Sequence, residues 1–139
     1  MRRGFEFEIL LNRLIQNLNA AGIHAHKNYA RRTSSGIYLD GEPFDFEVFH
    51  NGVFTTFDAK ECAGERWSLK NAKPHQIKNL LACAKNGARA YFLVWFRKLD
   101  KIVRFDATQV NEALANGKKS LSPDDGTPWS SEAFYDNKH

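Results

Sequence analysis

The feature that most constrains the fold is a nearly unbroken apolar run from Ala88 to Phe96. A strand with one wet face alternates apolar and polar residues, whereas a continuous run of this length is typical of a strand that is covered on both faces. Such a strand needs other strands beside it and further layers above and below it. The sequence therefore predicts a layered domain that contains both helices and a sheet.

Three segments have helical spacing. Apolar residues recur at three- and four-residue steps from about residue 4 to 20, and Gly22 follows as a stop. Pro74 stands where the first position of a second helix would be, and that helix closes at Gly87. A short last helix is expected from Thr108 to Asn116. Helices that alternate with strands in this order predict a mixed α/β (α+β) fold on one sheet.

Two further strands and two loops complete the expected order. Strands are expected at Ile23–Tyr29 and at Ile102–Phe105, the second paired with the apolar run. The basic stretch from Ala30 to Gly36 and the polar stretch from Glu61 to Lys73 are expected to be loops.

A hairpin is the strongest local signal. The aromatic-rich runs Phe44–Phe49 and Val53–Lys60 flank Asn51 and Gly52, and Asn-Gly between such runs favours a two-residue turn. With these two loop residues the register places Asp45 opposite Asp58. The face expected in the core carries Phe44, Phe46, Val48, Thr55, Phe57 and Ala59. The other face carries Asp45, Glu47, Phe49, Phe54, Thr56, Asp58 and Lys60.

The opposed carboxylates suggest a metal site. Like charges directly opposite each other destabilise an antiparallel pair. A divalent cation between Asp45 and Asp58 would remove this repulsion, and hard oxygen ligands suit Mg²⁺ or Mn²⁺. Lys60 lies two residues beyond Asp58 and so shares its face. The alternative is an ordinary salt-bridged surface patch, since D-x-K alone is common, and a one-residue bulge would break the opposition.

Composition and charge indicate which kinds of partner and cellular setting to expect for this chain. The formal charge of +4 favours a polyanionic partner, with a merely soluble basic surface as the alternative. No apolar run approaches the ~20 residues that cross a bilayer, and Glu6 and Glu8 interrupt the opening in a way that does not fit a signal peptide. Cys62 and Cys83 form no CxxC motif, so a reduced cytoplasmic setting is expected. The pair His24-x-His26 is interpreted as a polar strand face rather than a zinc site.

One domain is expected at residues 1–117, with 118–139 as a C-terminal tail. This tail contains Pro, Gly, Ser and paired Asp residues, so we expect it to be loosely ordered. It would pack, if at all, through Trp129, Phe134 and Tyr135.

The order of several short motifs resembles the PD-(D/E)xK nuclease superfamily and, within it, the RecU-type Holliday junction resolvases. The resemblance runs from Arg3 to about Phe105. Its pieces are Arg3-Gly4, Glu8 and Asn12, Asp45, Phe57-Asp58-Ala59-Lys60-Glu61, Leu69-Lys70-Asn71, His75-Gln76-Ile77 and Phe92-Leu93-Val94. It implies a restriction-endonuclease-like core and an Mg²⁺-dependent endonuclease that acts as a homodimer on branched DNA. Cleavage of ordinary duplex, as in restriction or repair nucleases, and DNA binding without catalysis are the alternatives.

The resemblance also implies roles for the matched residues. Asp45 and Asp58 would ligate the metal, with the Ala59 carbonyl as a further oxygen ligand. Lys60 would position the attacking water or stabilise the transition state. Glu8 would be an additional metal-associated acid, although an exposed acid in a first helical turn is also favoured by the helix dipole.

Gln76 would orient water or Lys60, with a helix-surface amide near an N-terminus as its alternative. The sequence departs from the RecU pattern in two ways. Its second acid, Asp58, is usually Glu, and the stretch from Asn28 to Pro43 is shorter than the arm that enters the junction in RecU enzymes. A phage-borne or otherwise reduced relative fits these departures. The expected location of such an enzyme is the cytoplasm, free or associated with the nucleoid.

Basic residues flank the candidate site in sequence and suggest a phosphate track. The expected DNA-binding residues are Arg31, Arg32, Arg66, Lys70, Lys73 and Lys78, with Trp67 and Tyr29 available for stacking.

Overall fold

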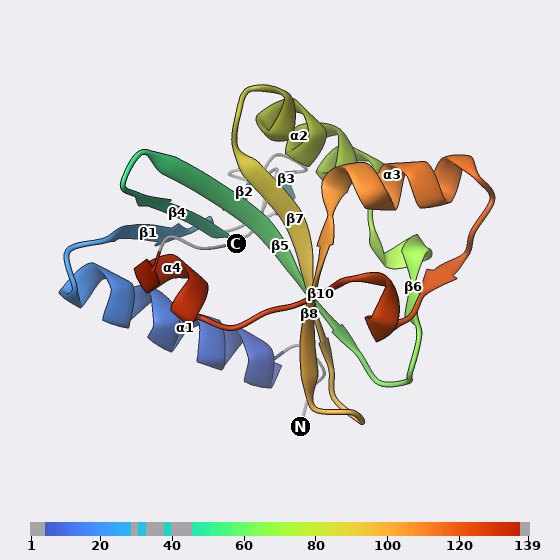
Figure 1. The fold of residues 1–139 in the computed structure, drawn as a ribbon, viewed down its shortest axis with the longest axis horizontal. Helices are drawn as coiled ribbons and strands as arrows, with labels where there is room; N and C mark the ends of the chain where they lie inside the picture. The colour runs from blue at the N-terminus through green and yellow to red at the C-terminus, as the bar shows by residue number, and fades with distance from the viewer. Residues whose placement is uncertain (1–4, 29–30, 33–37, 40–45, 137–139) are drawn as a thin grey trace.

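The computed structural model describes residues 5–28, 31–32, 38–39 and 46–136 (Figure 1). Its centre is a six-stranded sheet with the order β1-β4-β5-β7-β8-β10. These strands are β1 (His24–Lys27), β4 (Phe46–His50), β5 (Val53–Cys62), β7 (Arg89–Phe96), β8 (Lys101–Asp106) and β10 (Thr127–Pro128). β5 and β7 are parallel and the other neighbours are antiparallel. The predicted mixed α/β fold is confirmed.

Helices cover both faces of the sheet. α1 (Phe5–Ala20) and α4 (Glu132–Asp136) lie on one face, and α2 (Pro74–Lys85) and α3 (Ala107–Ala115) on the other (Figure 1). The first three helices match the predicted segments to within a few residues. In the part of the chain that the structure describes, no helix is long and apolar enough to cross a membrane.

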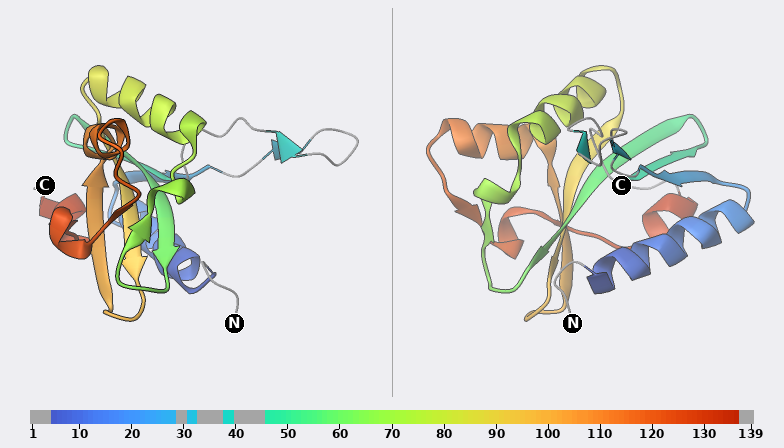
Figure 2. Two further views of the ribbon diagram at one scale, coloured as in Figure 1. Left: turned by 90° about the vertical axis from the view of Figure 1, so that its right-hand side faces the viewer. Right: turned by 180° about the vertical axis from the view of Figure 1, so that it is seen from behind.

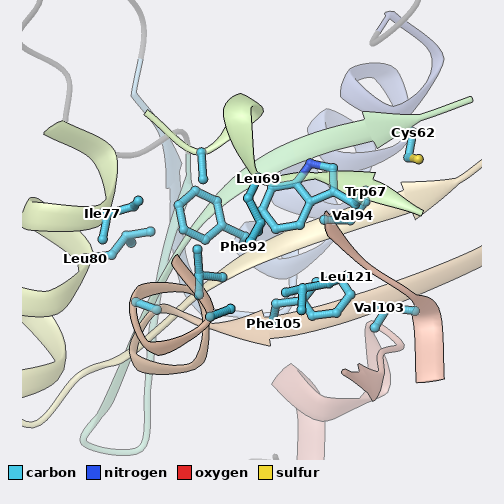
Figure 3. Close-up of a cluster of buried hydrophobic side chains, with 14 of the residues drawn as sticks. Cys62, Trp67, Leu69, Ile77, Leu80, Phe92, Val94, Val103, Phe105 and Leu121 are labelled. Carbon is cyan, nitrogen blue, oxygen red and sulfur yellow. The ribbon is translucent and has the colours of Figure 1, made fainter. Parts of the chain in front are cut away.

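The strand β7 has the buried environment predicted for the long apolar run. Tyr91 and Leu93 enter the cluster under α1, whereas Phe92 and Val94 enter the cluster under α2 and α3. Figure 3 shows the second cluster, in which Phe92 lies among side chains from β6, β8 and α2. Alternate residues of one strand therefore supply two separate cores, which explains why the run is apolar at nearly every position after Arg89.

The hairpin has the predicted register. Asn51 (φ 49°) and Gly52 (φ 79°) both adopt positive φ, as a type I′ turn requires. Pairing then runs from His50 opposite Val53 to Phe46 opposite Phe57. The prediction is confirmed up to this last pair, and Asp45 lies outside the described residues.

Two stretches expected to be loops contain regular structure. β6 (Trp67–Ser68) and the 3₁₀ helix η1 (Leu69–Asn71) interrupt the stretch from Glu61 to Lys73. β2 (Arg31–Arg32) pairs with β3 (Tyr38–Leu39) as a ribbon separate from the main sheet, which Figure 2 shows projecting from the body of the molecule. The loop predictions missed these elements because two-residue strands leave no periodic pattern.

The expectation of a loosely ordered tail after residue 117 is wrong for the described residues. β9 (Ser120–Leu121) pairs with β6, the 3₁₀ helix η2 (Pro123–Asp125) follows, and β10 then joins the edge of the sheet beside β8. Phe134 is 3% exposed, whereas Tyr135 remains 43% exposed. The segment is ordered because it completes both cores.

A buried tyrosine shows how this segment is anchored. The Trp129 indole nitrogen donates a hydrogen bond of 3.3 Å to the Tyr91 hydroxyl. Burial raises the pKa of Tyr91 well above its ordinary value, so the phenol stays neutral and can accept this bond.

Candidate active site

Asp58 and Lys60 form the centre of the candidate site. Both lie on β5, and their partners on the parallel neighbour β7 are Phe92 and Val94. Since both partners belong to the cluster under α2 and α3, strand alternation places Asp58 and Lys60 on that face. The Lys60 ammonium is 3.1 Å from an Asp58 carboxylate oxygen. The structure thus brings together two of the predicted catalytic residues.

The burial of this pair is unusual for charged groups. Asp58 is 1% exposed, and the Lys60 side chain is 19% exposed. A carboxylate withdrawn from water costs free energy unless a cation or hydrogen bonds compensate for the lost solvation. Lys60 provides one compensating charge. This environment argues against the solvent-facing salt-bridged patch that the sequence left open.

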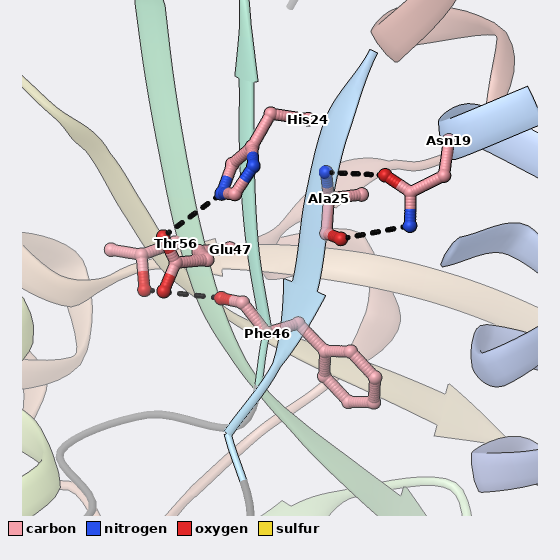
Figure 4. Close-up of polar contacts among 6 residues, drawn as sticks. All are labelled: Asn19, His24, Ala25, Phe46, Glu47 and Thr56. Carbon is pink, nitrogen blue, oxygen red and sulfur yellow. Dashed lines mark hydrogen bonds and ion pairs between the residues drawn. The ribbon is translucent and has the colours of Figure 1, made fainter. Parts of the chain in front are cut away.

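The strand residues beside Asp58 are also polar and buried. Thr56, 0% exposed, donates a hydrogen bond of 3.2 Å from its hydroxyl to the Phe46 carbonyl (Figure 4). Glu47 lies opposite Thr56 and faces His24 at 3.6 Å across the β1–β4 pair (Figure 4). On the hairpin face that was predicted to carry the chemistry, Thr56 and Asp58 are therefore buried and not open to solvent.

Glu8 is not placed beside Asp58 and Lys60. Its carboxylate pairs with the ammonium of Lys27, and its side chain is 49% exposed. Lys27 pairs with Phe46 across β1 and β4, and its ammonium lies 5.8 Å from the centroid of that ring, which belongs to the α1 cluster. α1 thus holds Glu8 on the opposite face of the sheet. The alternation of Ile23, Ala25 and Lys27 is the sequence signal that would have indicated this contact.

Gln76 lies in the first turn of α2 and is bonded to the backbone at the start of that helix. Its side-chain oxygen accepts a hydrogen bond of 3.1 Å from the Lys73 backbone nitrogen at the start of α2. This contact agrees with the interpretation of Gln76 as an amide at a helix N-terminus, where backbone N–H groups lack helical partners.

The predicted DNA-binding lysines are at the surface, in three different local settings. Lys70 lies in η1, Lys73 immediately before α2, and Lys78 within α2, and all three are exposed. Arg66 is exposed but is held by Ser120, with hydrogen bonds of 2.8 Å to its hydroxyl and 3.2 Å to its carbonyl. Arg31 and Arg32 form β2, and only their backbone is described. Tyr29 lies outside the described residues.

The prediction that Trp67 stacks on DNA is wrong. The side chain is 0% exposed, and its ring lies 5.5 Å from Phe92 and 5.6 Å from Phe105 between ring centroids (Figure 3). A base has no access to this ring. Trp67 is a core residue whose position in a polar stretch of sequence made it look exposed.

An ion-pair group beside the site was missed by the sequence interpretation. The Glu61 side chain is 3% exposed and pairs with Arg97 at 3.3 Å. Arg97 also pairs with Glu6 of α1 at 3.1 Å. Because Glu61 follows Lys60, strand alternation places it on the α1 face. The group connects the end of β5 to α1 and to the β7–β8 turn. Its only signal in the sequence was an acid directly after Lys60.

The donor set suits a hard divalent cation. Asp58 has a buried carboxylate, and the Ala59 carbonyl expected from the sequence as a further ligand is the next oxygen along the strand. Carboxylate and carbonyl oxygens are preferred ligands of Mg²⁺ and Mn²⁺. Within residues 5–28 and 46–136 no group of three His, Cys, Asp or Glu side chains is placed to hold a metal, and this range does not include Asp45.

Comparisons with known proteins agree on one family. The family model described as RecU, recombination protein U, matches residues 3–127. The chain is 27% identical over 124 residues to the Holliday junction resolvase RecU of Mycoplasmopsis pulmonis, covering 86% of this chain and 77% of that protein. It is 28% identical over 82 residues to RecU of Limosilactobacillus reuteri strain DSM 20016, covering 55% of this chain and 40% of that protein.

A solved structure supports the fold. The structure of Hjc from Archaeoglobus fulgidus, a Holliday junction resolvase, superimposes with a TM-score of 0.58 at 17% identity. The match covers 90% of this chain and 95% of that chain. At this identity the likeness concerns the fold, which is the restriction-endonuclease-like core expected from the sequence.

Proposed function

The chain belongs to the RecU family of recombination proteins, and on that premise we propose that it is a metal-dependent endonuclease that hydrolyses phosphodiesters in branched DNA. The observation that carries the proposal is the buried Asp58 with the Lys60 ammonium 3.1 Å away on the same strand face. A family of DNA resolvases and a paired acid and base in a D-x-K motif point to the same chemistry.

The proposed site divides the work among a few groups. Asp45, Asp58 and the Ala59 carbonyl would hold Mg²⁺, for which Mn²⁺ could substitute. The bound ion supplies positive charge against the charge that develops on the phosphate. Lys60 donates hydrogen bonds to the attacking water or to the transition-state phosphate, and Asp58 fixes the direction of its ammonium.

Glu8 and Gln76 are both engaged with other partners in the structure, so each would have to change its contact to take part in the proposed site. Glu8 would have to exchange its partner Lys27 for the metal or its water. Gln76 would have to leave the backbone of Lys73 to orient water. Both contacts lie in the first turn of a helix. Gln76 needs only this exchange, whereas Glu8 lies on the α1 face and would also have to reach past the sheet to meet Asp58.

The test of the function is cleavage of a four-way junction compared with a linear duplex of the same sequence, each with and without Mg²⁺. We expect Mg²⁺-dependent cleavage that favours the junction. Equal cleavage of both substrates would indicate a duplex nuclease, and binding without cleavage would indicate a DNA-binding module. As a DNA-cleaving enzyme the protein would work in the cytoplasm or at the nucleoid.

Lys70 and Lys73 are proposed to form a phosphate track, and the ribbon of β2 and β3, with Arg31 and Arg32, is proposed to reach the DNA as well. Replacing both lysines by alanine should weaken binding to every DNA sequence alike, because lysine–phosphate pairing carries no sequence information. The slope of log affinity against log salt should fall by about 0.9 for each phosphate that the variant no longer neutralises. Fluorescence anisotropy over a salt series measures this slope. The control is Lys101→Ala, an exposed lysine on β8, and an unchanged slope in the double variant would remove Lys70 and Lys73 from the interface.

We propose that a homodimer acts on the junction, because a four-way junction presents two related strands and each domain has one candidate site. Sedimentation of the protein with junction DNA should therefore show two protomers per junction. A one-to-one complex that still resolves the junction would contradict the dimer.

The proposed sharing of a metal by Asp45 and Asp58 can be tested through stability. Mg²⁺ should raise the melting temperature of the parent, because a ligand of the folded state stabilises by about 2.7 kcal/mol at a hundredfold excess over Kd. Asp45→Asn should lose most of this gain and, without metal, should be at least as stable as the parent, because a repulsion has been removed. Thermal melts of both proteins with and without Mg²⁺ measure it. An undiminished gain in the variant would show that Asp45 is not a ligand.

A further inference from the structure

A surface groove on the α2–α3 side of the molecule contains apolar residues that the proposed chemistry does not use, and Lys70 at its rim is its one residue in the proposed phosphate track. It has a volume of about 740 Å³ and is lined by residues of η1, α2 and α3. Its apolar floor includes Ile77 and Leu81 of α2 and Leu114 of α3, and Leu114 is 39% exposed. We call it the α2–α3 groove.

The charged residues of the groove are all of one sign. Lys70, Lys78 and Lys85 line it, and its described lining contains neither Asp nor Glu. Lys78 and Lys85 are seven residues apart, two turns along the same side of α2, as Ile77 and Leu81 are one turn apart. An apolar stripe and a lysine stripe therefore run next to each other along this helix.

Two occupants fit this arrangement poorly. DNA interfaces are polar, so a phosphate backbone would leave the leucine floor without matching contacts. A second copy of the chain, related by two-fold symmetry, would place the same lysine-rimmed surface on both sides and bring like charges together. The groove instead favours a ligand that combines apolar side chains with negative charge.

We propose that the α2–α3 groove binds an amphipathic, acidic helix of a partner protein. Apolar residues at helical spacing on the partner would cover Leu81 and Leu114, and its carboxylates would pair with Lys78 and Lys85. A helix of about three turns matches the ~18 Å length of α2. This partner surface goes beyond the proposed nuclease function and does not depend on it.

The test uses three synthetic helical peptides with the same leucine face and with Glu, Gln or Lys on the flanking positions. Binding to the metal-free, DNA-free protein is measured by fluorescence anisotropy. We expect the Glu peptide to bind about tenfold more tightly than the Gln peptide, since each surface ion pair contributes a few-fold. Binding of the Lys peptide should be weaker still. If no peptide binds, or if affinity does not depend on the charge, the proposal is wrong.

Matched variants locate the binding to the groove. Lys85→Glu should weaken the Glu peptide at least about tenfold, whereas Lys101→Glu, which makes the same change on β8, should not. Leu114→Ser should weaken all three peptides, and Leu10→Ser, on the equally exposed α1 surface, should weaken none. If Lys85→Glu impairs junction binding far more than Lys101→Glu does, the lysines serve DNA. If Leu114→Ser dissociates a dimer, the groove is an interface between copies. Either result overturns the proposal.

Discussion

Lys60→Ala and Asp58→Asn are each expected to reduce the proposed Mg²⁺-dependent junction cleavage by at least about a hundredfold while DNA binding stays nearly unchanged. In the proposed site both residues act on the charge of the transition state, whereas phosphate attraction would depend on the surface lysines. The measurement is single-turnover cleavage of a labelled four-way junction at saturating protein, which separates the chemical step from binding.

Two controls make this result specific. Lys98→Ala removes another lysine, 66% exposed at its side chain, that pairs with the equally solvent-facing Glu65 instead of Asp58, and it should leave cleavage unchanged. The double variant of Asp58 and Lys60 should be little worse than either single variant, because residues that act as one unit are not additive. Thermal melts exclude unfolding as the cause. Full cleavage by either folded single variant would remove that residue from the catalytic centre.

Trp67→Ala should lower the free energy of unfolding by about 3–5 kcal/mol, the cost of emptying a large buried aromatic site. Trp67 has ring neighbours on both β7 and β8, so its removal exposes the cluster under α2 and α3. Denaturant unfolding measures the change. DNA binding by the folded fraction, and its salt dependence, should match the parent because the ring cannot reach a base.

Trp67→Phe is the matched variant. It keeps an aromatic ring and removes the indole N–H, which is buried without a hydrogen-bond partner among the described residues. Trp67→Phe should therefore lower the free energy of unfolding by less than half as much as Trp67→Ala does. If Trp67→Ala remained as stable as the parent but lost DNA affinity, the stacking role would have to be restored.

The hairpin was predictable in detail because local rules determine it. Asn51 and Gly52 specify the turn, and the turn length then fixes every pair up to Phe46 opposite Phe57. That Asp58 and Lys60 share a face follows from strand alternation alone. Their contact at 3.1 Å and the burial of Asp58 became visible only in the structure.

Other features depend on contacts between distant segments, and local patterns do not record them. Trp67 lies in a polar stretch of sequence, yet its strand β6 pairs with β9 from near the far end of the chain, which places Leu121 opposite it. The family resemblance gives Glu8 the position of a metal-associated acid. In the structure, however, α1 holds it beside Lys27, on the face of the sheet opposite to Asp58. Arg97 shows no pattern of its own and gains its role only when Glu61 and Glu6 converge on it.

The ring of Phe57 connects β5 to the part of the chain that is synthesised last. Its neighbours are Tyr91 at 5.4 Å, Trp129 at 6.4 Å and Phe134 at 6.2 Å between ring centroids. A nascent chain still lacking Trp129 and Phe134 has only part of the aromatic packing behind β5, the strand that bears Asp58 and Lys60. Closing such long loops comes late, because their entropy is lost before the contacts form. In a ribosome-bound chain that stops short of these two residues, β5 therefore lies on an unfinished core.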